Sequence, residues 1–390
     1  MNLQYRHIVL VLCMLAFFVT YFARLAISPV VPSITDDFAI SNTLIGLALT
    51  GMWLAYGLAQ FPSGVLADRH GEKLIILLAV GGTTVMSLLL ALSPLYGVFV
   101  VAAVVLGGFA GLHYAVATTL LSRTFDNLGT AIGFHSIGGP LAGLLAPILA
   151  AWIGVRYGWR PAVAATAIFG IPIFLLFLWR VRPTAPRRPD ESMGDGIELR
   201  SLVELISRPE IAFPLVVAMA GTYVVQGLLS FFPAFLIAFH GYTPTAAGVV
   251  FSAFFIFRAC SQIGLGRVSD LYGRDAAIAG SMLAGAVGIP LIILDAGLLT
   301  MSIGVVLVGL SSAFFSAIDP RFIDALSVEE RGTGFGLVRT VYTVLGAAGS
   351  VGVGFTADLF GWDVAFGTLA ALFFAAFLAL IVNRALGLGY

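Results

Sequence analysis

Long apolar segments, separated by short polar loops, run through almost the whole chain. A membrane-spanning helix needs about 20 mainly apolar residues, and windows of that size predict twelve spans. We expect these spans near residues 8–31, 44–64, 74–93, 97–121, 130–153, 161–179, 211–237, 245–266, 276–294, 298–318, 333–356 and 364–383. The pattern therefore predicts an all-α integral membrane protein, in which the first apolar segment is retained as a helix.

A polar segment rich in Pro, Arg and Asp divides six spans from six. It predicts an N-terminal six-helix bundle over residues 1–179, a cytoplasmic linker over 180–210 and a C-terminal six-helix bundle over 211–390. Within the linker, residues 197–206 have enough apolar character to form a short helix along the membrane surface. A solvated linker is the alternative interpretation of the same residues.

The composition agrees with a bilayer environment and excludes several classes of function. Of 390 residues, 59% are hydrophobic and 10% are charged, against about 25% charged in soluble proteins. The net charge is zero, so we expect no nucleic-acid partner. The sequence contains no nucleotide-binding glycine loop, zinc signature or nucleophile elbow. We therefore expect neither enzyme activity nor a bound metal or cofactor.

The basic residues predict an orientation. Outside the spans, Arg156 and Arg160 lie on one side, and the other basic residues lie on the opposite side: Arg6, Arg69, Lys73, Arg123, Arg180, Arg182, Arg187, Arg188, Arg200, Arg208, Arg267, Arg274, Arg321, Arg331 and Arg384. Cytoplasmic loops carry the excess of Lys and Arg. We expect a multi-pass protein of a prokaryotic cytoplasmic membrane, with both termini and the linker in the cytoplasm.

One loop occurs twice, once in each half of the chain. Its two aspartates are 202 residues apart, and each loop separates two apolar spans. The positions that define it are Gly64, Asp68, Arg69 and Gly71 in the first half, and Gly266, Asp270, Gly273 and Arg274 in the second. The same offset relates Thr20, Arg24 and Ser28 of span 1 to Thr222, Gln226 and Ser230 of span 7. We infer two homologous six-helix halves.

Twelve spans, a six-plus-six repeat and the loop Gly64-x-Leu66-Ala67-Asp68-Arg69-x-Gly71 resemble the major facilitator superfamily. The start of span 1, Tyr21-Phe22-x-Arg24, is similar to that of members that carry organic anions. The resemblance implies alternating access of the two halves around a site at the membrane midplane. Glu72 departs from the family pattern, which usually has a basic residue there. We expect a functional monomer.

The resemblance also implies a role for the repeated loop. Asp68 would lie near the N-terminus of span 11 and Asp270 near that of span 5, with Gly64 and Gly266 allowing close helix approach. A carboxylate at a helix N-terminus contributes roughly 0.3–1 kcal/mol when exposed and about 2 when partly buried. These contacts would act as a conformational latch. The alternative is that Asp68 and Arg69 only solvate a turn and set the topology.

Three arginines, Arg24, Arg258 and Arg339, fall within apolar spans, and we expect no acidic residue deep in any span. An arginine at the bilayer centre costs at least about 2.5–3.5 kcal/mol, so these side chains should face a wet cavity. Guanidinium groups bind carboxylates through paired hydrogen bonds, and an electropositive cavity indicates an anionic substrate. Arg339 lies near enough to the span end to reach cytoplasmic water instead.

Further polar and aromatic residues are candidates for the same cavity. Gln226, Tyr56, Tyr223 and Tyr342 could bind substrate, although aromatic residues in such helices also serve packing. His113 and His135 are the deep histidines, and histidine titrates near neutral pH. Each could carry a coupling proton or, alternatively, be a neutral hydrogen-bonding residue in helix packing.

These observations favour a secondary active transporter of a small anion, either a carboxylate or an inorganic oxyanion, coupled to protons or to exchange. Two alternatives stay open. One is a proton-antiport exporter of amphipathic compounds or drugs. The other is a sensor or assembly protein that keeps the fold without transport.

Overall fold

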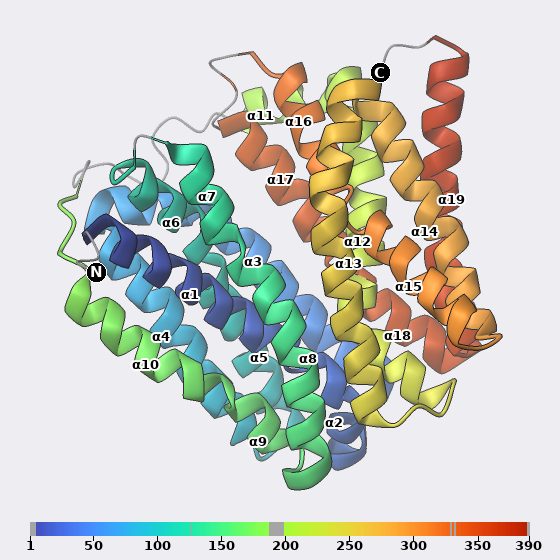
Figure 1. Cartoon of the computed structure of the whole chain (residues 1–390), viewed down its shortest axis with the longest axis horizontal. Coiled ribbons are helices and arrows are strands. Elements are labelled where there is room, and N and C mark those ends of the chain that lie inside the picture. The colour runs from blue at the N-terminus through green and yellow to red at the C-terminus, as the bar shows by residue number, and fades with distance from the viewer. Residues whose placement is uncertain (1–4, 126, 187–198, 328–329, 331–332, 388–390) are drawn as a thin grey trace. The chain divides into compact units, whose positions relative to one another are not determined.

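The computed structural model in Figure 1 describes residues 5–125, 127–186, 199–327, 330 and 333–387. These residues form helices, and none of them forms a strand. Twelve helical segments in the described ranges are long and apolar enough to cross a membrane. The predicted all-α fold with twelve spans is confirmed. The chain divides into two compact units, which are described separately below.

The first unit consists of residues Met1–Ile40, Ala48–Asp195 and Pro244–Val249. Its part of the chain contains helices α1 (Tyr5–Leu25), η1 (Ser28–Val30), α2 (Val31–Phe38), α3 (Asn42–His70), α4 (Glu72–Ala91), α5 (Tyr96–Gly111), α6 (His113–Ser122), α7 (Leu128–Ser136), α8 (Gly138–Tyr157), α9 (Trp159–Ala164) and α10 (Thr166–Arg180). Within this unit α1 packs against α4, α6, α7, α8 and α10.

The second unit consists of residues Ser41–Leu47, Gly196–Thr243 and Val250–Tyr390. Its part of the chain contains helices α11 (Leu199–Ser207), α12 (Pro209–Ala238), α13 (Pro244–Tyr272), α14 (Arg274–Leu294), α15 (Leu298–Ser311), α16 (Phe315–Ala325), α17 (Thr333–Gly346), α18 (Gly349–Phe360) and α19 (Trp362–Ala385). Here α12 occupies the place that α1 has in the first unit, in contact with α16, α17, α18 and α19. It is the most deeply buried of the twelve spans.

Several spans consist of two helices because the sequence interrupts the backbone hydrogen bonds. In the first span, Pro29 lies in the first turn of η1 and Pro32 in the first turn of α2. Proline lacks the N–H that a continuous helix requires and is tolerated in a first turn. The span therefore consists of the 21-residue helix α1 followed by two short pieces, η1 and α2, and Ser28 lies at the break between them.

Two helices change unit after their first turns. The start of α3, up to Leu47, belongs to the second unit, and the start of α13, up to Val249, belongs to the first. At α3, the Asp358 carboxylate of α18 accepts hydrogen bonds from the backbone N–H groups of Asn42 (3.1 Å) and Thr43 (2.7 Å). A carboxylate at this position satisfies N–H groups that have no partner within the helix and interacts favourably with the helix dipole. At the matching position of α8 the sequence has Val155, which carries no carboxylate.

Two expectations from the sequence are resolved by the helices themselves. The segment that could have been a solvated linker includes a helix, α11, and Leu205 in that helix is buried. The expectation that no acidic residue lies deep in a span was wrong for Asp319. The tenth span runs from Leu298 to Ala325 rather than ending near residue 318, and it therefore contains Asp319.

Candidate functional site

Arg24 lies at the end of α1, with 2% of its surface exposed. Its Nε donates a hydrogen bond to the Thr20 carbonyl one turn earlier, at 3.1 Å. Its other two guanidinium nitrogens, Nη1 and Nη2, are buried and have no hydrogen-bond partner among the described residues. A buried cation with unsatisfied donors is costly. The end of α1 therefore presents two donors for which the described residues supply no acceptor.

Three aromatic rings surround this guanidinium. Its carbon lies 4.0 Å from the ring centre of Tyr56, 4.8 Å from that of Tyr21 and 5.0 Å from that of Trp53. These distances are within the range of cation–π attraction, which stabilises a desolvated cation. The indole Nε1 of Trp53 is also buried without a partner in the described chain. The cage thus offers three unpartnered donors, one from the indole and two from the arginine.

Of these rings, the sequence analysis named Tyr56 as a substrate-binding candidate and Tyr21 as part of the motif before Arg24, and it missed Trp53. Tyr56 was a candidate for substrate binding, and the structure brings it against Arg24. Trp53 lies one turn earlier on the same helix, and residues at i and i+3 share a helix face. That spacing was the available signal for Trp53.

The residues of the second unit that match Thr20, Arg24 and Ser28 are Thr222, Gln226 and Ser230, and they make different contacts. Ser230 lies 2.6 Å from Ser350 of α18, between the two hydroxyl oxygens, and Thr222 packs against Gly346 of α17. Gln226 lies between them, 6% exposed, and its Oε1 has no partner within the described residues. Its position, buried and unsatisfied, is compatible with the predicted contact to a ligand.

Arg258 lies on α13, in the second unit, where its guanidinium carbon is 6.0 Å from the ring centre of Phe315. Its Nη1 is buried and has no hydrogen-bond partner in the part of the chain that the structure describes. This nitrogen is a further donor able to bind an anion. It has a single aromatic neighbour at cation–π distance, whereas Arg24 has three.

Arg339 and Tyr342 both interact with Asp319, the carboxylate that the sequence analysis placed outside the span. The Tyr342 hydroxyl donates a hydrogen bond to Asp319 Oδ1 at 2.9 Å, and the charge of Arg339 attracts the same carboxylate. The expectation of three arginines without an intramembrane counter-ion is therefore wrong for Arg339. Its charge is offset within the second unit, which leaves Arg24 and Arg258 as the stronger anion-binding candidates.

Tyr223 was predicted to line the cavity and lies close against α18. Its hydroxyl occupies the space next to Gly352, and its carbonyl lies next to Gly349, where in each case a Cβ would collide with it. Glycine has no Cβ, so the two helices can approach at these points. Packing alone accounts for the position of Tyr223.

His113, at the start of α6, and His135, near the end of α7, lie next to each other with their ring planes tilted by 50°, and both contact α1. Their ring centres are 5.3 Å apart, and both side chains have 0% exposure. Phe17 of α1 lies 5.9 Å from His113 and 5.3 Å from His135, measured between ring centres. The structure thus brings together two histidines that are 22 residues apart in the sequence.

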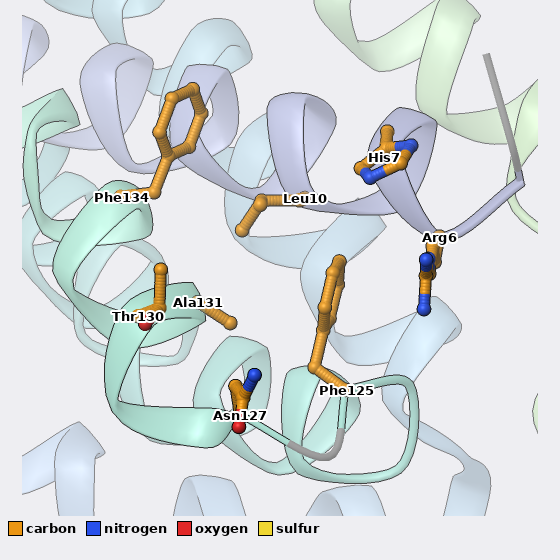
Figure 2. Close-up of a pocket in the computed structure, with 8 residues that line it drawn as sticks. All are labelled: Arg6, His7, Leu10, Phe125, Asn127, Thr130, Ala131 and Phe134. Atoms are coloured by element: carbon orange, nitrogen blue, oxygen red, sulfur yellow. The ribbon is translucent and has the colours of Figure 1, made fainter.

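A pocket of about 290 Å³ opens in the first unit, as Figure 2 shows. It lies between the start of α1, the segment before α7, and α7 itself, with the His7 and Phe125 side chains on one flank and Phe134 on another. Its lining residues are Arg6, His7, Leu10, Phe125, Asn127, Thr130, Ala131 and Phe134.

The repeated loop has a well-defined conformation in the first unit. Gly71 has φ +85°, and a Cβ there would collide with the Thr184 carbonyl. The Thr184 hydroxyl in turn accepts a hydrogen bond from the Lys73 N–H at 3.0 Å. Glu72, the departure from the family pattern, has 0% side-chain exposure and forms an ion pair with Arg123 at 2.9 Å.

The second copy of the loop has a similar backbone conformation at its second glycine, and the residue after that glycine has the opposite charge. Gly273 has φ +94°. Arg274, which corresponds to Glu72, pairs with Asp270 and with Asp324, the latter at 3.0 Å. A Cβ on Gly64 or on Gly266 would meet nothing within 4 Å, so neither glycine is needed for close packing inside its own unit. The predicted contacts of Asp68 and Asp270 with spans 11 and 5 stay predictions.

Comparison with known proteins agrees with this architecture. The family model described as Major Facilitator Superfamily matches residues 13–243 and 227–386. The chain belongs to the major facilitator superfamily, a family of membrane transporters.

Two relatives cover most of the chain. A hexuronate transporter of Bacillus subtilis (strain 168) is 23% identical over 379 residues, covering 90% of this chain and 88% of the relative. A probable 4-methylmuconolactone transporter of Cupriavidus pinatubonensis is 26% identical over 376 residues, covering 92% of this chain and 86% of the relative. Among solved structures, the nucleoside transporter NupG has a TM-score of 0.79 at 13% identity, over 97% of this chain and 99% of that one. This last likeness concerns the fold alone.

Proposed function

We propose that this protein is a secondary active transporter of small organic anions, and that Arg24 binds the carboxylate of the substrate. The observation that carries the proposal is the buried guanidinium whose Nη1 and Nη2 have no acceptor in the described chain. A carboxylate supplies two oxygens in the geometry of those two nitrogens. The indole N–H of Trp53, whose ring centre lies 5.0 Å from the guanidinium, adds a third donor without a partner in the described chain.

The relatives support a small organic anion as the substrate. A hexuronate is a sugar acid, and the relative from Bacillus subtilis is described as its transporter. Such molecules combine one carboxylate with a ring, and the cage around Arg24 combines one cation with the faces of aromatic rings. Aromatic faces stack favourably on flat or apolar ring surfaces. We therefore place carboxylates carried on a ring ahead of inorganic oxyanions.

The transport cycle that we propose is alternating access of the two homologous halves. Asp68 and Asp270 would act as latches at helix N-termini, as their repeated positions suggest. The two are not equivalent, because Arg274 neutralises Asp270 locally, whereas the corresponding residue in the first loop, Glu72, is itself acidic. Asp68 would then contribute more to the latch than Asp270.

The proposal is tested by binding and uptake with two matched arginine variants. Arg24→Gln removes the buried cation, and Arg156→Gln removes an arginine that also lies over an aromatic ring, at 4.4 Å from Trp152, but is exposed to solvent. We expect glucuronate to raise the thermal unfolding temperature of wild type and of Arg156→Gln. A ligand at 100 times its dissociation constant adds about 2.7 kcal/mol of stability.

Glucuronate uptake into proteoliposomes should fall at least tenfold in Arg24→Gln and stay within twofold of wild type in Arg156→Gln. Unchanged uptake in Arg24→Gln would contradict the role of Arg24. Efflux of neutral or cationic dyes by wild type, with no response to any carboxylate in a panel, would contradict the anion-transporter proposal and favour an exporter of amphipathic compounds.

A further inference from the structure

The His113–His135 pair is the most deeply buried titratable cluster outside the Arg24 cage in the described chain. All four ring nitrogens lack a well-aligned hydrogen-bond partner among the described residues, although the Cys13 carbonyl of α1 lies near both rings. A neutral imidazole carries one donor and one acceptor, and a buried polar group without a partner costs roughly 1–3 kcal/mol. Helix packing alone does not account for two such rings with their centres 5.3 Å apart.

The surroundings of the pair narrow what it can bind. Within the described chain, no third His, Cys, Asp or Glu joins the two rings in an arrangement that could hold a metal ion. The groups next to the rings are the Cys13 backbone carbonyl of α1 and Tyr114 of α6, whose ring centre is 5.5 Å from that of His135, and the nearest fixed charge that we identify for the pair is Arg24 of α1. None of these groups is a carboxylate, so an added proton is not held by a fixed counter-ion.

The pocket in Figure 2 has lining residues one helical turn from the pair on α7 and one turn from Cys13 on α1. Ala131 lines that pocket and lies one helical turn before His135 on α7, on the same helix face. Leu10 lines it from α1, one turn before Cys13. The pocket volume of about 290 Å³ is several times the roughly 30 Å³ that one water occupies in the liquid. His7, on the wall of the pocket, is a further titratable group there.

The charge of Arg24 links the pair to the anion site. Arg24 and His113 are in the same unit, and two rings of α1 connect them: the Arg24 guanidinium lies 4.8 Å from the ring centre of Tyr21, which is 5.7 Å from that of Phe17, which is 5.9 Å from that of His113. Two positive groups repel each other strongly where the dielectric constant is low. A protonated histidine is therefore disfavoured while Arg24 is unliganded. An anion on Arg24 cancels this repulsion and favours the protonated pair.

From this geometry we infer that His113 and His135 form the proton-binding site of an anion–proton symporter, in which the carboxylate on Arg24 and the proton on the pair stabilise each other. One proton from water is taken up by one imidazole nitrogen, and the resulting N–H donates a hydrogen bond to the unprotonated nitrogen of the second ring, directly or through a water. The loaded site has then gained one anion and one proton. The inference rests on the proposed function, since it requires an anion at Arg24.

The coupling is reciprocal by thermodynamic linkage. Protonation of the pair must raise the affinity for the anion by the same factor by which the anion raises the affinity for the proton. Binding of glucuronate should therefore weaken as the pH rises through the titration of the pair, and it should be accompanied by proton uptake. A histidine pair that serves only packing would produce neither effect.

The test uses the full-length protein in proteoliposomes with labelled glucuronate, in two modes. Uptake driven by an inward proton gradient requires a coupled proton, whereas counterflow, the exchange of labelled for unlabelled glucuronate, does not. We expect the double variant His113→Gln/His135→Gln to retain counterflow within about threefold of wild type and to lose gradient-driven accumulation at least tenfold. The matched control is His240→Gln, because His240 lies in the second unit and contacts the Ile292 carbonyl at 2.9 Å. It should behave as wild type in both modes.

A second measurement does not depend on the histidine variants folding. Glucuronate added to weakly buffered wild-type protein in detergent should cause the uptake of about one proton per anion bound, read by a pH dye, and none with Arg24→Gln. Gradient-driven accumulation that persists in the double variant, or anion binding by wild type without proton uptake, would overturn the inference and leave the anion site intact. Absence of binding, counterflow and uptake in wild type, across a panel of carboxylates, would overturn the proposed function and this inference with it.

Discussion

The two copies of the repeated loop are stabilised by ion pairs of opposite sense. In the first unit the acid Glu72 opens α4 and pairs with Arg123, the residue that follows α6. In the second unit the base Arg274 opens α14 and pairs with Asp324 near the end of α16. Glu72 and Arg274 are 202 residues apart, the offset of the whole repeat. In both units an ion pair joins the start of one helix (α4 or α14) to the end of another (α6 or α16), but the acidic and basic residues have exchanged places.

The two pairs differ more in burial than in distance. Glu72 is 0% exposed and Arg123 28%, whereas Arg274 is 27% and Asp324 56% exposed. Exposed ion pairs contribute about 0–1 kcal/mol, whereas removing one partner of a buried pair leaves a desolvated charge and costs about 3–5 kcal/mol. The first loop should therefore depend on its ion pair, and the second should depend on it little.

The largest effect is expected from Arg123→Ala. This change leaves the Glu72 carboxylate buried without its cation, so the free energy of unfolding should fall by roughly 3 kcal/mol, at the lower end of the range for buried pairs because Arg123 is partly exposed. Thermal or denaturant unfolding of the purified protein in detergent measures the loss. Arg274→Ala is the matched control in the other unit, and equal losses in the two variants would contradict the distinction by burial.

A second large difference is expected between the two loop glycines. Gly71 and Gly273 have φ +85° and +94°, a region that is essentially restricted to glycine and costs other residues about 1–3 kcal/mol. At Gly71 an added Cβ also collides with the Thr184 carbonyl, whereas at Gly273 it meets nothing within 4 Å. Gly71→Ala should therefore lower the free energy of unfolding by about 1–2 kcal/mol more than Gly273→Ala does, the range in which forced rearrangement of a packed site usually falls.

The measurement is the same unfolding assay, with wild type and both alanine variants side by side. If the two variants are equally destabilised, the contact with Thr184 does not stabilise the loop, and only the shared backbone conformation does.

The spans and the repeat were predictable because both depend only on the order of residues along the chain and not on contacts between distant helices. Runs of apolar residues set the helices, and a constant offset relates Asp68 to Asp270. The partner of Glu72 was not predictable in this way. Arg123 follows Glu72 in the sequence only after the three helices α4, α5 and α6, and the family pattern indicated a base at position 72. The position of Asp319 was missed for a smaller reason, since the apolar window ended one residue before it.

The candidate site shows the same limit. Arg24 stood out because a charge inside an apolar span is costly, and the repeat marked it further by placing Gln226 at the matching position. Its cage also needed Trp53, which comes from another helix. The counter-ion of Arg339 likewise lies on a different helix. Sequence spacing gives the face of one helix, and it does not give the neighbour that the face meets.

A smaller but sharper effect is expected from double-mutant cycles on the two ion pairs. Glu72→Gln with Arg123→Gln removes both charges, so the double variant should lose less stability than the two single variants predict when added. Contacting residues show interaction energies of about 0.5–3 kcal/mol, and we expect about 1–2 kcal/mol for this pair. The same cycle with Arg274→Gln and Asp324→Asn should give less than about 1 kcal/mol.

Salt is the control for the cycles. Exposed charges are largely screened at high ionic strength, whereas buried pairs are screened much less. The interaction energy of Arg274 with Asp324 should shrink in about 1 M salt, while that of Glu72 with Arg123 should change little. Interaction energies that are equal, or that respond equally to salt, would show that the exchange of sign between the loops is not accompanied by a difference in environment.

The smallest effect is expected from Arg274→Ala, with less than about 1 kcal/mol lost in the free energy of unfolding. Its main consequence should lie elsewhere, because Arg274 also pairs with Asp270. Without that arginine, Asp270 resembles Asp68, which has the acidic Glu72 at the same spacing. A carboxylate released from a local partner interacts more strongly with a helix N-terminus, so a latch at Asp270 would strengthen and glucuronate counterflow should slow by about twofold. Arg274→Lys, which keeps the charge, should restore the wild-type rate. Counterflow that is unchanged in Arg274→Ala, together with counterflow that falls in Asp68→Asn, would assign the latch to the first loop alone.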